Sequence, residues 1–204
     1  TLEAYVLYYK KKRGLSDAEF EQFVARRIEE SGRYSAPHRR AIAGACAERG
    51  IAIASHDDAT VEHVEESKTF GVRLAEFPTS MEAAQASHQA GMAVLMGAPN
   101  IVRGKSHSGN ISAKALADAR VLDVLSSDYV PFSLIHAPFL LADEDGGMSL
   151  PQSISLVTAN PGDAVGLGDR GRIAPGLRAD LVRVRRPAGI PVVRSVWREG
   201  NRVV

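Results

Sequence analysis

The sequence predicts an α/β protein in which a parallel sheet of alternating strands and helices is followed by a small all-β module. Gly50, Gly71 and Gly91 each precede a short apolar segment, and they lie about one strand–helix unit apart. After residue 169 the pattern changes to valines that alternate with arginines, which is typical of strands. Strands that alternate with helices form parallel sheets with right-handed crossovers.

Residues 1–49 are predicted to be helical. Ser16 is followed three residues later by Glu19, which is the capping-box pattern of a helix start. Apolar residues then recur at helical spacing: Phe20, Phe23, Val24 and Ile28. We expect Gly32 to end this helix and a second helix to run over about 37–48. Its inward face would hold Ile42, Ala45 and Cys46.

Residues 50–142 are predicted to form the strand–helix units of the sheet. Each glycine would end one helix, and the strands would cover residues 51–56, 72–76, 92–97 and 121–126. The helices between the first three strands would begin at hydroxyl residues, Thr60 and Ser80. A last helix is expected over 149–159, and we place the boundary of the β module after residue 166.

Composition excludes several classes of protein. The formal net charge is +1, so neither a nucleic-acid partner nor a membrane surface is expected, and the basic run from Lys10 to Arg13 is interpreted as a solvated face. No apolar run reaches the roughly 20 residues of a membrane-spanning helix, and the first residues do not resemble a signal peptide. The single cysteine, Cys46, predicts a core thiol in a reducing, cytoplasmic setting. A homo-oligomer is compatible with this composition.

Polar residues follow the predicted strands at their C-terminal ends, where sites collect in parallel sheets. These residues are His56, Asp57, Asp58, Glu76 and Asp128. Among them, Asp57, Asp58 and Glu76 are candidates for binding the substrate. Imidazole and carboxylate groups on neighbouring strand ends are the donors that a metal-assisted hydrolase needs. Taken singly, these residues also fit structural roles. A lone histidine is often structural, and Asp128 could cap a helix that begins at Pro131.

The segment 97–110 is the most polar of these strand ends. Its glycines and Pro99 predict an irregular loop whose free N–H groups could bind an anion. The candidate ligand-binding side chains are Asn100, Arg103, Lys105, Ser106, His107, Ser108 and Asn110. Guanidinium, ammonium, hydroxyl and amide groups together suit a phosphorylated small molecule. The alternative is a solvated polar surface loop.

The C-terminal residues predict a β-hairpin and one further strand. Val182 and Val184 alternate with arginines, and residues 192–197 are expected to pair with 202–204 across the turn at 199–201. Trp197 would anchor the core of this module.

The C-terminal sequence resembles the signature of the amidohydrolase superfamily. The residues that carry this resemblance are Leu156–Pro161 and Asp169–Val182. Members of the superfamily are (β/α)8 barrels with a small β-sandwich built from both chain termini. The resemblance therefore implies the C-terminal part of such a barrel over residues 1–166 and the C-terminal strands of the sandwich over 167–204.

A narrower resemblance is to the diphosphatases of phosphonate catabolism within this superfamily. Five motifs carry it, in order: Ala54–Thr60, Ala75–Thr79, Met96–Arg103, Ser106–Asn110 and Ser126–Tyr129. The resemblance implies hydrolysis of a triphosphate with release of pyrophosphate, and two divalent ions, zinc or manganese. It implies that His56 is a metal ligand at the end of strand 6, and that Asp128, on strand 8, binds a metal and acts as general base.

The sequence departs from the superfamily pattern in its metal ligands. The His-x-His motif of strand 1, the bridging residue of strand 4 and the histidine of strand 5 have no counterpart, and the four predicted strands would match strands 6, 7, a short extra strand and 8. We therefore expect the C-terminal half of a longer protein, inactive by itself. The alternatives are another amidohydrolase, such as a cyclic-amide hydrolase or deacetylase, and an inactive fragment that binds phosphate or a partner chain.

Overall fold

The computed structural model describes residues 8–10, 12–104, 109–144 and 147–204. The chain divides into two compact units, Thr1–Ala45 and Cys46–Val204, and each is described by itself. None of the described helices is both long enough and apolar enough to cross a membrane.

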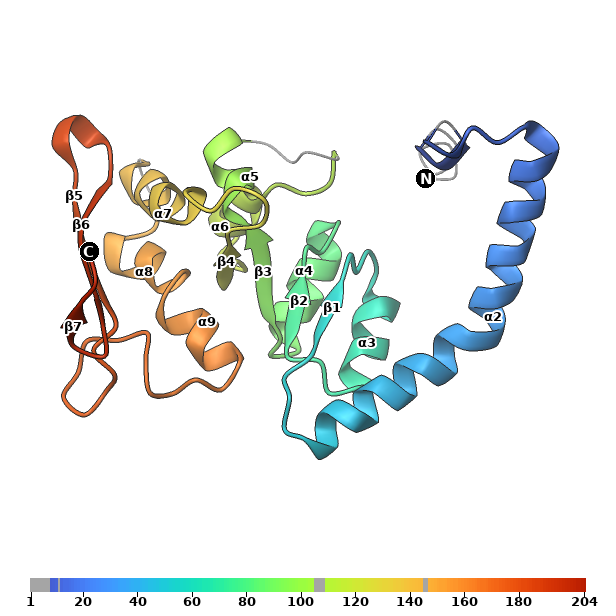
Figure 1. The fold of residues 1–204 in the computed structure, drawn as a ribbon, viewed down its shortest axis with the longest axis horizontal. Coiled ribbons are helices and arrows are strands. Elements are labelled where there is room, and N and C mark those ends of the chain that lie inside the picture. Colours follow the sequence, from blue (N-terminus) through green and yellow to red (C-terminus); the bar gives the residue numbers. More distant parts are fainter. Residues whose placement is uncertain (1–7, 11, 105–108, 145–146) are drawn as a thin grey trace. The chain divides into compact units, whose positions relative to one another are not determined.

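α2 runs without interruption from Asp17 to Glu48, and all but its last three residues belong to the first unit (Figure 1). The predicted capping box is present, because the Ser16 N–H donates to Glu19 Oε2 at 2.9 Å and the Glu19 N–H donates to Ser16 Oγ at 3.4 Å. The predicted break is wrong, since Gly32 and Pro37 both lie inside the helix. Pro37 removes one helical hydrogen bond, a local loss that a helix of this length tolerates with a bend.

The apolar face predicted for the first unit is only partly confirmed. Phe20 and Phe23 are buried, with their ring centroids 6.4 Å apart. Ile42 is 60% exposed, so the inward position assigned to it is wrong, and Ile28, which continues the helical spacing, is 68% exposed. Cys46 is half-buried and does not belong to the core. Helical spacing identifies a face, but a face is buried only where another element packs against it.

The second unit contains the predicted parallel sheet (Figure 1). Its strands lie side by side in chain order: β1 (Ala54–His56), β2 (Leu74–Glu76), β3 (Ala93–Gly97) and β4 (Val124–Ser126). All three pairings are parallel, as the alternation of strands and helices predicted. β3 is the longest of the four and pairs with both neighbours, so it is not the short extra strand that we expected.

Helices follow the strands, and their first residues agree with the predicted caps. Thr60 caps α3 (Val61–Thr69) and Ser80 caps α4 (Met81–Gln89), each accepting a backbone N–H of the first turn. The glycines at 50, 71 and 91 have φ values of +64°, +70° and +78°, which lets the chain turn out of each preceding helix.

The later helices differ from the predictions in three respects. The segment 97–110 is not irregular throughout, because α5 occupies Ala98–Arg103 and Gly104 ends it with φ +77°. α6 (Ala113–Asp118) leads to β4. α7 covers Ser133–Asp143, so Asp128 does not cap it. The single helix expected over 149–159 is two short helices, α8 (Leu150–Ser155) and α9 (Ala159–Ala164).

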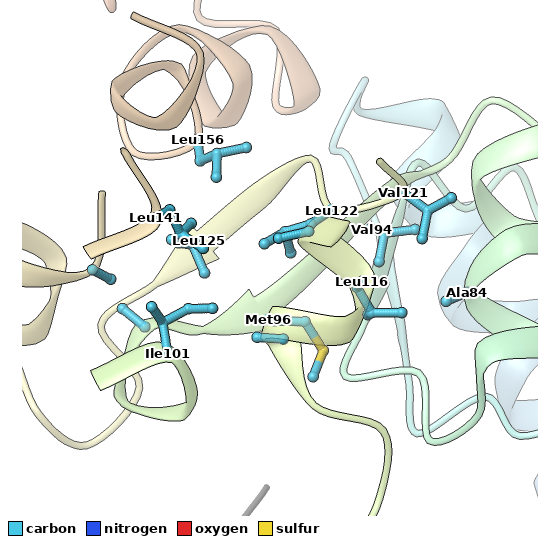
Figure 2. Packing of buried hydrophobic residues seen from close by; sticks show 14 residues of the cluster. Ala84, Val94, Met96, Ile101, Leu116, Val121, Leu122, Leu125, Leu141 and Leu156 are labelled. Atoms are coloured by element: carbon cyan, nitrogen blue, oxygen red, sulfur yellow. The ribbon is translucent and has the colours of Figure 1, made fainter. Parts of the chain in front are cut away.

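The main core lies on one face of the sheet (Figure 2). Val94 and Met96 of β3 and Leu125 of β4 gather there with apolar residues of the helices. These helix and loop residues include Ala84, Leu116, Leu122, Leu141 and Leu156. Since side chains alternate along a strand, His56 and Glu76 project from the opposite face of the sheet.

The C-terminal module is a three-stranded antiparallel sheet in the order β5-β6-β7. β5 covers Leu181–Arg185, β6 covers Val192–Arg198, and β7 covers Asn201–Arg202, with the 3-10 turn η1 at Pro187–Gly189. The predicted pairing of β6 with the last residues is confirmed, since Trp197 lies opposite Arg202. Trp197 is only half-buried, so it does not anchor a core here. A three-stranded sheet buries a large side chain only when a second layer covers that face.

Candidate functional site

The candidate site lies at the C-terminal rim of the parallel sheet. His56 is opposite Glu76 in the pairing of β1 with β2, and Gly97 is opposite Ser126 in the pairing of β3 with β4. The ladder continues one step beyond the strands, because the Asp57 N–H donates to the Glu76 carbonyl at 3.0 Å. The structure therefore brings the predicted strand-end residues to one rim of one sheet.

The backbone at this rim is strained at three positions. Asp57, Phe77 and Asp128 have φ values of +61°, +54° and +47°, and none of them is glycine. Asp57 directly follows β1, Phe77 directly follows β2, and Asp128 lies two residues after β4. Such conformations cost about 1–3 kcal/mol each and collect at functional sites, where they aim a side chain. The strain supports the assignment of this rim as the site.

His56 is oriented by two neighbours. Its Nδ1 lies 3.2 Å from Asp57 Oδ2, and its ring meets the Phe77 ring edge-on with the centroids 5.4 Å apart. A histidine whose one nitrogen faces a carboxylate keeps the other nitrogen for a ligand, as metal-binding histidines do. Asp57 is thus better placed to orient His56 than to contact a substrate directly.

Asp128 lies against Gly97 and is exposed to solvent. A methyl carbon built on Gly97 would be 3.1 Å from Asp128 Oδ2 and 3.6 Å from Phe77 Cε1. Phe77 therefore contacts the His56 ring and also approaches the place where Asp128 and Gly97 meet. Sequence reasoning missed Phe77, which looked like an ordinary apolar residue after a strand.

Arg103 is held beside the Asp128 loop by a residue that sequence reasoning also missed. The Arg103 Nη2 donates to the Tyr129 hydroxyl at 2.9 Å, joining the end of α5 to the segment after β4. Tyr129 is 58% exposed, so burial does not account for its position. Its place next to Asp128 in the sequence was the available signal.

Two predicted substrate-binding residues make internal hydrogen bonds. Asp58 is buried and accepts the Ser67 hydroxyl of α3 at 3.4 Å. Asn100 Oδ1 accepts the Ala113 N–H at the start of α6, at 3.1 Å. These contacts give both residues a structural role in the described chain, and their contact with substrate stays a prediction.

The remaining predicted residues of segment 97–110 divide in two groups. Asn110 is exposed and lines a hollow of about 630 Å³ together with Thr79, Ser80 and Gly104. This hollow lies beside the start of α4, at the same end of the sheet as the rim. Four residues lie outside the described part of the chain: Lys105, Ser106, His107 and Ser108.

A metal centre at this rim would have to draw on further donors. An imidazole and a carboxylate, as in His56 and Asp128, are donors that zinc and manganese accept. Over residues 8–10, 12–104, 109–144 and 147–204, no three histidine, cysteine, aspartate or glutamate residues gather closely enough to hold an ion. His56 and Asp128 therefore suit a metal centre only if other residues supply the remaining ligands.

Comparison with known proteins gives a consistent picture. The model of the Amidohydrolase family matches residues 34–204. The alpha-D-ribose 1-methylphosphonate 5-triphosphate diphosphatase of Escherichia coli (strain K12) is 51% identical over 98% of the chain, which covers 53% of that protein. The imidazolonepropionase of Streptomyces griseus is 40% identical over 45% of the chain, which covers 27% of that protein.

The fold is also found among solved structures. The crystal structure of an uncharacterized protein matches 81% of the chain with a TM-score of 0.60 at 19% identity, and the match covers 48% of that protein. The chain thus spans about half the length of the diphosphatase and of this structure.

Proposed function

The chain belongs to the amidohydrolase family, and on that premise we propose that it is the C-terminal half of a metal-dependent diphosphatase. The substrate would be alpha-D-ribose 1-methylphosphonate 5-triphosphate, cleaved in phosphonate catabolism to pyrophosphate and a 5-phosphate. The observation that carries the proposal is the 51% identity to the diphosphatase over 98% of the chain, which includes the whole rim. The protein would act in the cytoplasm.

The order of the strands supports the idea of a half barrel and favours a different numbering of its strands. If β4 is the eighth strand of the barrel, the adjacent strands β3, β2 and β1 are the seventh, sixth and fifth. His56 then ends the fifth strand, and Glu76 ends the sixth. Strands one to four, with the metal ligands that they carry, would come from residues outside this chain.

His56 and Asp128 would contribute to holding the divalent ions, zinc or manganese. When bound, such ions polarise phosphoryl oxygens and lower the pKa of water toward 7. Asp57 keeps the His56 ring oriented through the 3.2 Å contact of its carboxylate. The edge-on contact with the Phe77 ring restricts the His56 ring on a second side.

In the reaction, a water oxygen would form a bond to the phosphorus that carries the sugar oxygen. The bond from this phosphorus to the pyrophosphate oxygen breaks, and Asp128 accepts the proton of the water. Arg103, steadied by Tyr129, would donate to the phosphate oxygens and offset the charge that builds on the leaving pyrophosphate. Lys105 and His107 would act with it.

Isotope labelling in the full-length protein tests this function. Turnover of the ribose triphosphate in H2¹⁸O, followed by ³¹P NMR, should release pyrophosphate without label and place one ¹⁸O in the 5-phosphate product. Label in the pyrophosphate would mean attack at the middle phosphorus and would refute the mechanism. A chelator should abolish turnover, and added divalent ions should restore it.

A second candidate is an imidazolonepropionase-type activity, which the matches over 104 residues favour. Hydrolysis of imidazolonepropionate gives no role to the guanidinium of Arg103, held by Tyr129, because no polyphosphate charge has to be neutralised. Turnover of imidazolonepropionate by the same protein sample, with no pyrophosphate release from the triphosphate, would favour this candidate.

A further inference from the structure

The backbone conformation at position 97 does not require a glycine. Its φ and ψ are −74° and 127°, an extended geometry that any residue adopts. It is buried at the end of β3, where most positions carry an apolar side chain. The reason for a glycine at this position therefore has to lie in the atoms packed beside it.

Asp128 occupies the space that a side chain at position 97 would need. A Cβ on Gly97 would lie 3.1 Å from Asp128 Oδ2 and 3.4 Å from Asp128 Cβ. The first distance is short for a carbon and an oxygen and the second is short for two carbons, so Asp128 would have to shift by a few tenths of an ångström. Phe77 Cε1, at 3.6 Å, bounds the same space from the β2 side.

Little else holds the Asp128 carboxylate. No residue within the described ranges forms a hydrogen bond or an ion pair with it. Its φ of +47° directs the side chain back toward β3, and packing against Gly97 then sets where the oxygens lie. Because Asp128 is exposed, it can move aside at low cost to the fold.

We infer that Gly97 is a positioning residue, which acts through Asp128 by leaving room for its carboxylate beside β3. Phe77 forms the second wall of this space and, through its edge-on contact with His56, couples the positions of the two predicted ligands. The catalytic meaning of this arrangement rests on the proposed function, whereas the placement of the carboxylate does not.

The test is Gly97→Ala in the full-length protein, with Gly168→Ala as the matched control. Gly168 is exposed, has no positive φ, and has no atom within 4 Å of an added Cβ, so it makes the same chemical change in open space. Crystal structures of both variants should show the Asp128 carboxylate displaced only in Gly97→Ala. Misplacement of a reacting group by about 1 Å costs on the order of 100-fold in rate, so a smaller shift should lower kcat about tenfold.

The kinetics and the melting temperature distinguish a positioning role from a merely structural one. If Gly97 positions Asp128, Gly97→Ala lowers kcat while KM and the melting temperature stay near those of the control, because Asp128 shifts without unfolding the rim. An unmoved carboxylate, or a loss of activity that follows a lowered melting temperature, would overturn the inference. If the wild-type protein does not cleave the triphosphate, the proposed function fails, and the crystallographic displacement still decides the role of Gly97.

Discussion

The best test of the C-terminal signature compares two glycines with almost the same positive φ. Gly171 and Gly176 have φ values of +84° and +85°, so alanine meets left-handed strain at both, about 1–2 kcal/mol. An added Cβ at Gly171 would lie 2.7 Å from the Thr158 carbonyl oxygen and 2.9 Å from Ala159 Cα. At Gly176 it would meet nothing within 4 Å.

The difference between Gly171→Ala and Gly176→Ala therefore isolates the clash. The atoms at Gly171 belong to the backbone and cannot rotate away, and overpacking of this kind costs about 1–3 kcal/mol. The gain from a less flexible unfolded chain is the same for both and cancels. We expect Gly171→Ala to be less stable than Gly176→Ala by about 1–3 kcal/mol.

Urea denaturation of the two variants in one protein background measures this difference. For a protein of about 200 residues each kcal/mol shifts the melting temperature by about 2–4 °C, so thermal unfolding gives a second reading. Equal midpoints would show that the loop around Thr158 moves to admit the methyl group. In that case, the close approach of the signature loop to the start of α9 does not contribute to stability.

Three further predictions concern catalysis, acid stability and completeness. In the full-length protein, Asp128→Asn should lower kcat severely at unchanged metal content, and Arg103→Ala should chiefly raise KM; the reverse pattern in steady-state kinetics would mean that the roles are misassigned. Hydrogen bonds from Arg186 hold the pKa of Asp143 below its ordinary value of 3.8, so this pair stabilises the fold above about pH 4 and the contribution is lost as the pH falls further. The melting-temperature difference between wild type and Asp143→Asn should accordingly shrink from pH 7 to pH 3, and a constant difference would contradict the assignment. Residues 1–204 alone should self-associate, bind metal weakly and release no pyrophosphate, whereas stoichiometric binding of two ions with turnover would refute the half-barrel interpretation.

Local signals were enough to predict much of the second unit. Glycines that end helices and hydroxyl residues that cap the next ones depend on a few neighbouring backbone groups, so Gly71 and Thr60 could be assigned from the sequence. The parallel order also followed from the alternation of strands and helices, because the crossover connection restricts it. The same reasoning placed His56 and Asp128 at the ends of strands.

Non-local packing decided the rest. Pro37 and Gly32 are local signals for a helix end, yet the helix continues through both, because its remaining hydrogen bonds outweigh one that is lost. Spacing placed Ile28 on the apolar face and marked Ile42 as an inward residue, but whether they are buried depends on a neighbouring element that the pattern does not contain. Trp197 is half-buried for the same reason.

At the site, local sequence pattern predicts which chemical groups reach the rim, whereas the assembled sheet sets the contacts that each of them makes there. Asp58 stands next to Asp57 in the chain, but its carboxylate accepts a hydrogen bond from α3, while Asp57 faces His56. Gly97 and Phe77 carry no functional group, and their importance follows only from the approach of β2, β3 and the segment after β4. Strand ends can be located from local pattern, whereas contacts between residues 20 to 50 positions apart arise only when the sheet is assembled.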